Sequence, residues 1–248
     1  MRLTEALPSE GLVCVVGAGG KKSTLYALAN ALDRAVVTAT VRIPVFDDHV
    51  ARVEVTDQPV AAVRAASEAA ETGDGNWPLG LVPEQERPDR YRGYDPETVA
   101  DLAANVSVPV LVKADGARSR WLKAPNEREP QVPATADAVC PVASVRVVGE
   151  PLAEERVHRP ERVAAVTGRA VGDELTADDV ARVLTHPDGG LKDVPDDATV
   201  VPILNMVDDA ELAATAHYIA ARIHDYSDRI DRVVLTCFAD EDPVVDVV

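Results

Sequence analysis

The sequence predicts an α/β fold in which helices cover both faces of a mostly parallel sheet. Short apolar runs rich in β-branched residues recur along the chain, and several are almost continuously apolar, as strands covered on both faces are. Helical patterns alternate with these runs, and such alternation is typical of parallel strands joined by helices. At 248 residues and 46% hydrophobic composition, the chain is long enough for one large domain of this kind. We therefore expect a single domain over 1–248.

The expected elements follow in chain order. Strands are expected at 12–16, 35–40, 109–114, 138–142, 199–204 and 232–236. Helices are expected at 22–32, 59–71, 96–105, 176–184 and 210–223. Thr176 is a suitable N-cap, because Asp178 and Asp179 place acidic groups in the following turn. Two segments without periodicity, 73–95 and 115–133, are expected to be long surface loops, which commonly serve function in compact domains.

The chain is strongly acidic, with a formal net charge of -17 at pH 7. Such a surface repels the phosphates of nucleic acids, so the sequence argues against a nucleic-acid partner. A carboxylate-rich, lysine-poor composition favours solvation in concentrated salt and therefore predicts a halophilic source. The lysines are Lys21, Lys22, Lys113, Lys123 and Lys192.

The sequence also predicts a cytoplasmic protein without a membrane partner. No apolar run approaches membrane-spanning length, and the opening MRLTEALPSEG lacks the basic region and apolar core of a signal peptide. Cys14, Cys140 and Cys237 are far apart and match no metal-binding spacing. We expect them to be reduced thiols in the core.

A glycine-rich loop joins the first expected strand to the first expected helix, in the stretch VCVVGAGGKKSTLYALANAL that begins at Val13. Phosphate binding needs this arrangement, because N–H groups at a helix N-terminus point at the anion and glycine lets the backbone approach it. The expected nucleotide contacts are Gly17, Ala18, Gly19, Gly20, Lys21, Lys22, Ser23 and Thr24. Lys21 is expected to be exposed and to act catalytically on the outer phosphates, and Ser23 to ligate Mg²⁺. A glycine turn beside an incidental lysine pair is the alternative.

The loop has the spacing of a shortened phosphate loop. Gly17 stands three residues before Gly20, so the full GxxxxGK[ST] pattern is absent. The pattern G-x-x-G-K-x-[ST] is present and resembles the nucleotide loop of Mur ligases and folylpolyglutamate synthetases. It predicts a three-layer α/β/α domain similar to the P-loop NTPases, with ATP or GTP and Mg²⁺ as ligands.

A second nucleotide signal lies in VVPILNMVDD, where an expected strand ends at Asn205 and Asp208 follows. This N-x-x-D spacing resembles the base-recognition motif of G-proteins, with Met206 in place of lysine. An aspartate there can accept two N–H bonds from guanine, while the asparagine bridges toward the phosphate loop. Asp208 or Asp209 can instead cap the next helix, and both interpretations stay open.

Asp115 follows another expected buried strand, in VPVLVKADGARSR. A carboxylate at a strand's carboxyl end beside a phosphate loop can hold Mg²⁺ directly or through water. Asp115 is therefore expected to be a metal ligand and, with Lys21, a catalytic residue. Turn formation by Asp115 and Gly116 is the alternative.

Five segments occur in the order seen in the YqeC family, the accessory proteins of selenium-dependent molybdenum hydroxylases (selenium cofactor biosynthesis). They are VVGAGGKKST, VVTAT, VKADGARSRWLKAPNEREPQVP, PLAEERVHRPERVAAVTG and VPILNMVDD. The resemblance covers nearly the whole chain. It implies a P-loop nucleotide-binding protein that helps to mature molybdenum hydroxylases, with such an enzyme or its cofactor as a partner.

Three residues depart from the family pattern: Lys22 stands for threonine, Arg42 for lysine and Lys113 for glutamate. If a glutamate at position 113 activates water, its replacement by lysine weakens the case for hydrolysis.

The resemblance also gives meaning to polar residues in two non-periodic segments. Lys123, Glu127, Glu129, His158 and Arg159 are expected to form a site for an anionic second substrate or a partner. A solvated charged loop is the alternative.

These observations predict an accessory protein that binds a nucleoside triphosphate and acts as an NTPase or a phosphoryl-transfer enzyme. One alternative is a Mur-like ATP-dependent ligase or small-molecule kinase. Another is a nucleotide-gated binding module that does not hydrolyse its ligand.

Overall fold

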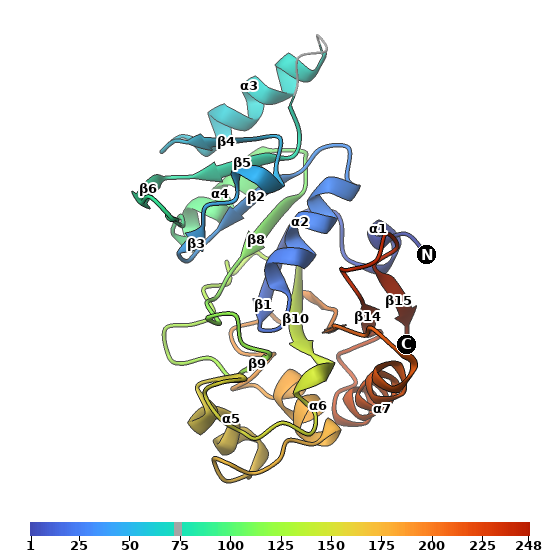
Figure 1. The fold of residues 1–248 in the computed structure, drawn as a ribbon. Coiled ribbons are helices and arrows are strands. Elements are labelled where there is room, and N and C mark those ends of the chain that lie inside the picture. The colour runs from blue at the N-terminus through green and yellow to red at the C-terminus, as the bar shows by residue number, and fades with distance from the viewer. Residues whose placement is uncertain (72–75) are drawn as a thin grey trace.

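The computed structural model describes residues 1–71 and 76–248, and its largest element is a ten-stranded sheet. The strands are β1 (Leu12–Gly17), β2 (Val36–Ala39), β4 (Arg52–Val55), β5 (Leu79–Val82), β8 (Val110–Lys113), β10 (Ala138–Ser144), β12 (Thr199–Val200), β13 (Ile203–Asn205), β14 (Val234–Thr236) and β15 (Val244–Val247). Their order is β15-β14-β13-β10-β1-β8-β2-β5-β4, with β12 paired to β10 beside this path (Figure 1). Among the described pairings of this sheet only β14 with β15 is antiparallel. The predicted mostly parallel α/β fold is confirmed.

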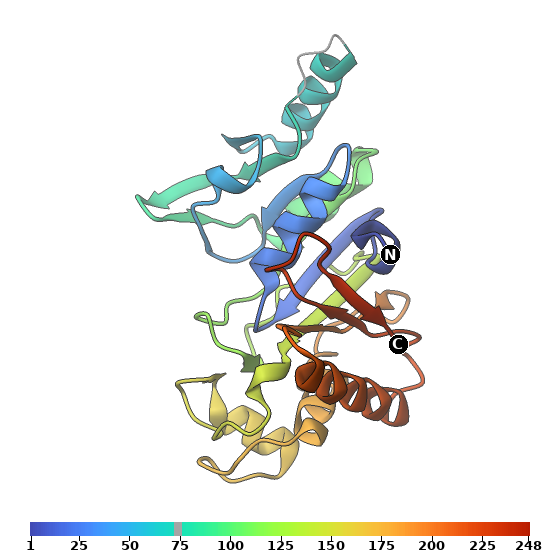
Figure 2. The same cartoon turned by 45° about the vertical axis from the view of Figure 1, so that its right-hand side comes forward.

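Helices cover the two faces of this sheet. They are α1 (Leu3–Ala6), α2 (Lys21–Ala31), α3 (Pro59–Glu71), α4 (Pro96–Asn105), α5 (Pro160–Thr167), α6 (Ala177–Thr185) and α7 (Ala210–Tyr226). Along β1 the side chains alternate between two buried clusters: Val13 and Val15 join residues of α1 and α2, and Cys14 and Val16 join residues of α3, α4, α6 and α7. Such alternation is the period of a strand buried on both faces. The termini lie side by side, since α1 packs against β15 (Figures 1 and 2).

The expected elements are present, with one interruption. The run expected at 199–204 is divided into β12 and β13 because Pro202 has no N–H to donate to the sheet. Helices α3 and α4 have the bounds expected from the sequence. Thr176 caps α6 as predicted: its Oγ1 accepts from the Asp179 amide at 3.3 Å, and Oδ2 of Asp179 accepts from the Thr176 amide at 2.8 Å.

The expectation of a loop at 73–95 is wrong. Strand β5 of the main sheet lies within it, and so do β6 (Glu84–Arg87) and β7 (Arg90–Arg92), which form a small antiparallel sheet with β3 (Ile43–Pro44). The charged run of β6 and β7 has no apolar alternation, because this small sheet leaves most of its side chains in solvent. Residues 72–75 of the expected loop lie outside the described residues.

The segment 115–133 is also not entirely irregular. It contains β9 (Leu122–Lys123), which pairs in parallel with β11 (Val157–His158). This pairing brings the two polar segments singled out in the sequence side by side. Helix α5 and strands β4 and β15 were not expected either.

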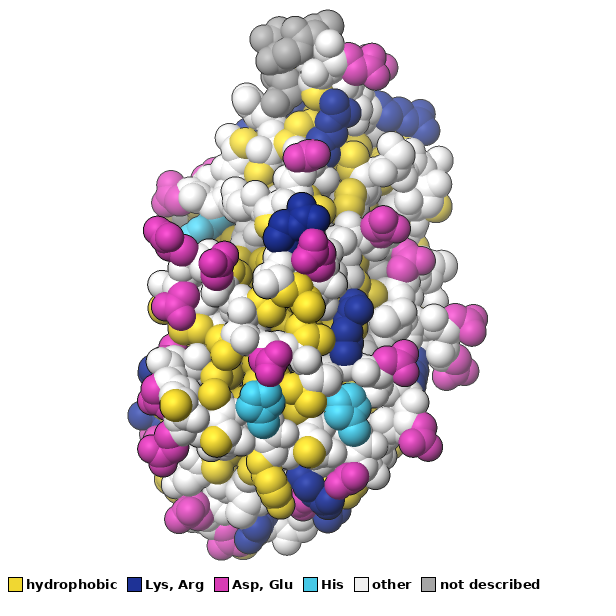
Figure 3. All heavy atoms as spheres, turned by 90° about the vertical axis from the view of Figure 1, so that its right-hand side faces the viewer, with side chains coloured by type: hydrophobic (Ala, Val, Ile, Leu, Met, Phe, Trp, Pro, Cys, Tyr) yellow, Lys and Arg dark blue, Asp and Glu magenta, His cyan; other side chains and the backbone are white. Residues whose placement is uncertain are grey.

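The surface carries the acidity of the composition. Carboxylate side chains are spread over the face shown in Figure 3, with basic side chains between them. Cys14, Cys140 and Cys237 are buried free thiols, as predicted. Within residues 1–71 and 76–248, every helix is too short or too polar to cross a bilayer.

Candidate functional site

The candidate site lies at the carboxyl edge of the central strands. Because β1, β8, β10 and β13 are parallel, their carboxyl ends meet at the same edge. The loop at residues 17–20 follows β1, which stands between β8 and β10. Asp115 lies two residues beyond β8, and Asn205 is the last residue of β13. The fold therefore brings the glycine loop, Asp115 and Asn205 together.

The glycines of the loop are required by space and by backbone conformation. Gly17, Gly19 and Gly20 have φ values of 88°, 80° and 149°. A Cβ on Gly17 would lie 2.4 Å from the carbonyl oxygen of Val142, and one on Gly20 would lie 2.2 Å from Nδ2 of Asn205. Only glycine fits such positions without displacing its neighbours.

The amide groups of the loop fall into two sets. The N–H groups of Ala18 and Gly19 are used internally, donating to the carbonyls of Val142 at 2.9 Å and Arg120 at 2.8 Å. Those of residues 20–23, at the start of α2, have no acceptor within the described part of the chain. Unpaired N–H groups at a helix N-terminus form an anion-binding position.

Lys21 is buried, contrary to the expectation of an exposed loop lysine, and its side chain is only 6% exposed. Its Nζ lies 2.9 Å from Oδ1 of Asp115 and donates to the Gly17 carbonyl. Lys22 and Ser23 are exposed at the start of α2. Thr24 is buried, and its hydroxyl donates to the Gly20 carbonyl at 3.2 Å. The first turn of α2 thus presents one free ammonium group and one free hydroxyl to solvent.

Asp115 holds the centre of the site. Its Oδ2 accepts from the Gly17 amide at 2.9 Å and lies 2.8 Å from Nζ of Lys123. Burial raises the pKa of the Asp115 carboxyl, but the ammonium groups of Lys21 and Lys123 outweigh burial and leave that pKa below its usual value. The carboxylate is therefore ionised at neutral pH.

The residues around the glycine loop offer few oxygen ligands for Mg²⁺. Oδ1 of Asp115 is buried without a well-aligned hydrogen bond, although the Lys21 ammonium is near. The hydroxyl of Ser23 is exposed at the start of α2, and a hydrated magnesium ion, which keeps several of its waters, can be held by one such oxygen. No group of three histidine, cysteine or acidic side chains in 1–71 and 76–248 is arranged to hold a metal alone. A magnesium ion here would thus need the ligand's phosphates as well.

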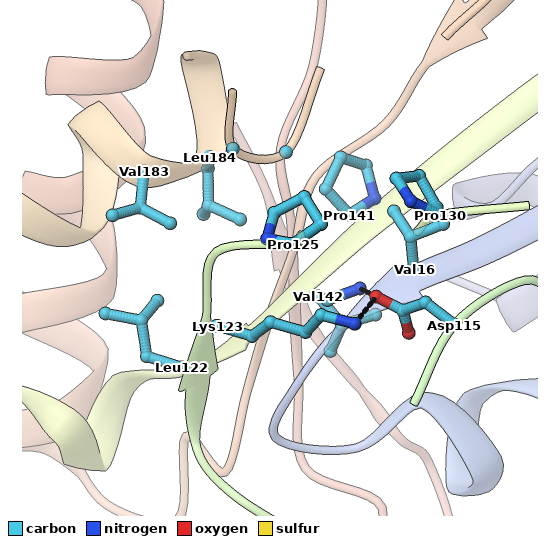
Figure 4. A pocket seen from close by; sticks show the side chains of 13 residues that line it. Val16, Asp115, Leu122, Lys123, Pro125, Pro130, Pro141, Val142, Val183 and Leu184 are labelled. Atoms are coloured by element: carbon cyan, nitrogen blue, oxygen red, sulfur yellow. Dashed lines mark hydrogen bonds and ion pairs between the residues drawn. The ribbon is translucent and has the colours of Figure 1, made fainter. Parts of the chain in front are cut away.

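Lys123 and Glu129 continue a chain of ion pairs behind Asp115. Nζ of Lys123 lies 2.7 Å from Oε2 of Glu129 and donates to the Gly116 carbonyl at 2.5 Å. The same Glu129 oxygen lies 2.9 Å from Nη1 of Arg159. Figure 4 shows the Lys123 side chain extended toward Asp115 along a cavity of only about 10 Å³. These three residues are brought together, and with Asp115 they form a chain of two cations and two carboxylates.

The other two residues of that expected group lie differently. Glu127 is exposed and pairs with Arg162. His158 is half-buried, and burial together with the nearby Arg159 charge lowers its pKa to about 4. His158 is therefore neutral at pH 7 and adds no positive charge for an anion.

Asn205 ties the loop to the neighbouring strands. Its Nδ2 donates to the Gly19 carbonyl at 2.7 Å, and its Oδ1 accepts from the Thr236 hydroxyl at 3.1 Å. Asp208 pairs with Arg146 at 2.5 Å and accepts from the thiol of Cys237 at 3.2 Å. Asp209, not Asp208, caps α7, with its Oδ1 accepting from the Leu212 amide at 2.8 Å.

A cavity of about 400 Å³ opens beside the loop. Arg90, Arg118 and Arg120 line it, and the sequence had not singled them out as site residues. Arg90 carried no signal, since its segment showed no periodicity. Arg118 and Ser119 have positive φ values of 48° and 60°. Strained backbone of this kind is concentrated at functional sites.

The chain is an α/β protein in which a strand–loop–helix unit, the unpaired amides of α2 and a buried lysine–aspartate pair have the arrangement of a phosphate loop. The family comparison agrees with the resemblance seen in the sequence. The pattern of the YqeC family, described as YqeC protein, matches residues 13–161, and the chain belongs to this family.

Two individual proteins give the range of similarity. The chain is 28% identical over 207 residues to the uncharacterized protein YqeC of Escherichia coli (strain K12), across 82% of this chain and 78% of that protein. Among solved structures, a ParA family ATPase from Chlorobium tepidum TLS aligns with 87% of this chain and 81% of its own, at 13% sequence identity and a TM-score of 0.43. The second likeness is too low to carry an argument.

Proposed function

We propose that this protein binds a nucleoside triphosphate with Mg²⁺ and acts as an accessory NTPase or phosphoryl-transfer enzyme. The observation that carries the proposal is the start of α2. Four consecutive N–H groups without acceptors in the described chain face the 400 Å³ cavity, beside the exposed ammonium of Lys22. Oriented amides and the helix dipole favour an anion with several oxygens at this position.

The residues around the loop would then have separate roles. The amides of 20–23 and Lys22 bind the outer phosphates, and Ser23 offers its hydroxyl to the metal. Lys21, the proposed catalytic lysine, is held against the loop by Asp115 and leaves the Gly17 carbonyl to reach a phosphate. Asp115 would help to hold a hydrated Mg²⁺ through a water on Oδ1, the oxygen that faces the Lys21 ammonium. When bound, Mg²⁺ supplies neutralisation of phosphate charge.

Lys113 favours transfer to a bound acceptor over hydrolysis. It stands where the family pattern has glutamate, and its buried Nζ donates to the Arg42 carbonyl at 3.0 Å. Burial lowers the Lys113 pKa to about 7, with the Lys21 charge as the next cause. A lysine at this position offers no carboxylate to orient a water for attack. This observation supports the ligase or kinase alternative.

The proposed physiological role is maturation of selenium-dependent molybdenum hydroxylases in the cytoplasm. Family membership supports it, and the buried free thiols fit a reducing compartment. The test is a strain deleted for this protein, complemented with the parent or with Lys21→Met. We expect low hydroxylase activity and low cofactor selenium without the functional protein. Normal values in the deletion strain reject this role.

The nucleotide site is tested by thermal denaturation in molar KCl with ATP, GTP or CTP, each with and without Mg²⁺. A ligand at 100 times its Kd stabilises the folded state by about 2.7 kcal/mol. Lys22→Ala and Asp115→Asn should reduce that gain, Asp115→Asn mainly in the presence of Mg²⁺. Lys192→Ala is the matched control, since Lys192 lies away from the cavity. The protein could instead bind the nucleotide tightly and neither hydrolyse it nor transfer its phosphate to added small-molecule acceptors. That result would favour the alternative of a nucleotide-gated binding module.

A further inference from the structure

The cavity beside the loop differs in charge from the rest of the molecule. Seven of its sixteen lining residues are lysine or arginine, and none is aspartate or glutamate. The whole chain has 42 acidic residues against 25 lysines and arginines, so an acid-free basic cavity departs sharply from its surroundings. Carboxylates are spread across the face in Figure 3. A local excess of one charge in a concave site attracts ligands of the opposite charge.

The basic residues of the cavity come from different elements. Lys21 and Lys22 lie at the start of α2. Arg42, Arg90 and Lys113 come from the side of β8 and β2: Lys113 ends β8, and Arg42 lies three residues beyond β2. Arg90 joins them because β7 pairs with β3, which places Arg90 opposite Pro44. The cavity therefore has basic side chains beyond those at the start of α2.

The cations on the side of β8 and β2 are available to a ligand. Arg42 and Arg90 pair with Glu86 and Asp89, but their side chains are 64% and 42% exposed. Exposed ion pairs contribute little in general, but Arg42 donates two hydrogen bonds to Glu86, so an anionic ligand must displace that carboxylate to use both of its donors. Lys113 has only the Arg42 carbonyl as its partner in the described chain. By contrast, Lys123 and Arg159 are committed to Asp115 and Glu129.

We propose that Arg42, Arg90 and Lys113 bind a second small substrate that carries a phosphate or carboxylate group, next to the bound nucleotide. The inference deepens the proposed function and rests on it. Arginine forks bind such groups in a bidentate manner, and the Lys113 amino group adds a further hydrogen-bond donor. The second-substrate site is thereby placed on the β2 and β8 side of the loop, rather than at Lys123, His158 and Arg159.

The test is calorimetric titration of two probes, inorganic phosphate and acetate, into the protein saturated with Mg²⁺ and the nucleoside diphosphate of its preferred base. The variant is Arg42→Gln/Arg90→Gln, and the matched control is Arg52→Gln. Arg52 is 42% exposed in β4, pairs with Glu54 and does not line the cavity. Circular dichroism verifies that each variant is folded.

We expect phosphate or acetate to bind the parent protein saturated with Mg²⁺ and nucleotide. The probe that binds identifies the kind of group that the site prefers. The double variant should weaken that binding about tenfold or more and keep nucleotide affinity within about twofold, with Arg52→Gln like the parent. Absence of binding by both probes, unchanged binding in the double variant, or an equal loss of nucleotide affinity overturns the inference.

If the proposed nucleotide site is wrong, the titrations give a different set of results. If no nucleotide binds, the probes are titrated into the free protein and into Lys22→Ala. Binding that survives Lys22→Ala and is lost in Arg42→Gln/Arg90→Gln keeps the arginine site while the proposed function fails. Loss in both variants means one shared anion site and overturns the inference.

Discussion

The ammonium nitrogen of Lys123 lies 2.8 Å from Oδ2 of Asp115, and neither side chain is more than 2% exposed. Lys21 approaches the other oxygen of the same carboxylate at 2.9 Å. One buried carboxylate thus faces two lysines, and the second acid needed for balance is Glu129, 2.7 Å from Lys123.

Lys123→Met should therefore destabilise the fold strongly. Lys123→Met breaks two ion pairs at once, those with Asp115 and Glu129, so we expect a loss approaching the roughly 3–5 kcal/mol of a broken buried pair. Chemical denaturation in molar KCl measures the free energy of unfolding, with Lys192→Met as the control. Asp115→Asn/Lys123→Met should recover part of the loss, since it removes both charges. A loss below about 1 kcal/mol for Lys123→Met, as for a surface pair, contradicts this account.

Lys21→Met should remove nucleotide binding with a smaller cost to the fold. Asp115 keeps Lys123 and the Gly17 amide when Lys21 is gone, so we expect a loss of about 1–3 kcal/mol in unfolding free energy. Calorimetry gives the nucleotide affinity of the folded variant. Lys22→Thr removes the exposed ammonium of Lys22 and should weaken nucleotide affinity less than Lys21→Met does. Unchanged affinity in folded Lys21→Met contradicts the proposed site, and a larger loss in Lys22→Thr means that Lys22 is the principal lysine.

Asn205 and Asp208 should have separable effects. Asn205→Ala removes the bond to the Gly19 carbonyl and should weaken ATP and GTP alike, because it loosens the loop. If Asp208 reads the base, the parent prefers guanine nucleotides and Asp208→Ala abolishes the preference. Calorimetry with ATP, GTP and CTP measures both effects. Equal affinities in the parent contradict base recognition by Asp208.

His158 should make stability depend on pH in a defined window. Its pKa falls from 6.5 to about 4 on folding, chiefly through burial. Between these values the unfolded chain binds more protons, so the His158 contribution to stability rises from pH 4 to 6.5 and is constant above. His158→Gln should remove that part of the slope. The measurement is the difference in unfolding free energy between parent and variant across this range, and a constant difference contradicts the prediction.

The acidic composition should make folding depend on salt. Like charges repel over a Debye length of about 30 Å at 0.01 M salt, and that length falls to about 3 Å at 1 M. We expect the thermal midpoint to rise from dilute buffer to molar KCl, with sucrose at matched viscosity as the control. Full stability in dilute buffer refutes the halophilic interpretation.

The core strands and the loop were predictable because their signals are local. Apolar runs such as β1, and the glycines between β1 and α2, follow from periodicity and backbone conformation. Strands β6 and β7 were not predictable, because they pair in a small sheet whose side chains are mostly in solvent. Because most of their side chains are in solvent, these strands show no alternation of apolar and polar residues in the sequence.

The charge state of the site also lay beyond sequence reasoning. Lys123 and Arg159 look like free cations in a polar loop. They form ion pairs with Asp115 and Glu129 in the folded protein, where β9 pairs with β11 beside the main sheet. Position along the chain indicated which residues gather at the strand ends, but not which of them neutralise one another.

The bonds that support the glycine loop join parts of the chain made at very different times. The Gly17 amide donates to Asp115, which lies 98 residues later in the sequence, and the Gly19 carbonyl accepts from Asn205, which lies 186 residues later. Closing such long loops is costly in entropy, and parallel sheets of this kind fold slowly. During synthesis the loop therefore emerges from the ribosome long before its supports do. The glycine loop has all of its supports only after Asn205 has been made, so ligand binding there would report an assembled sheet rather than guide its early folding.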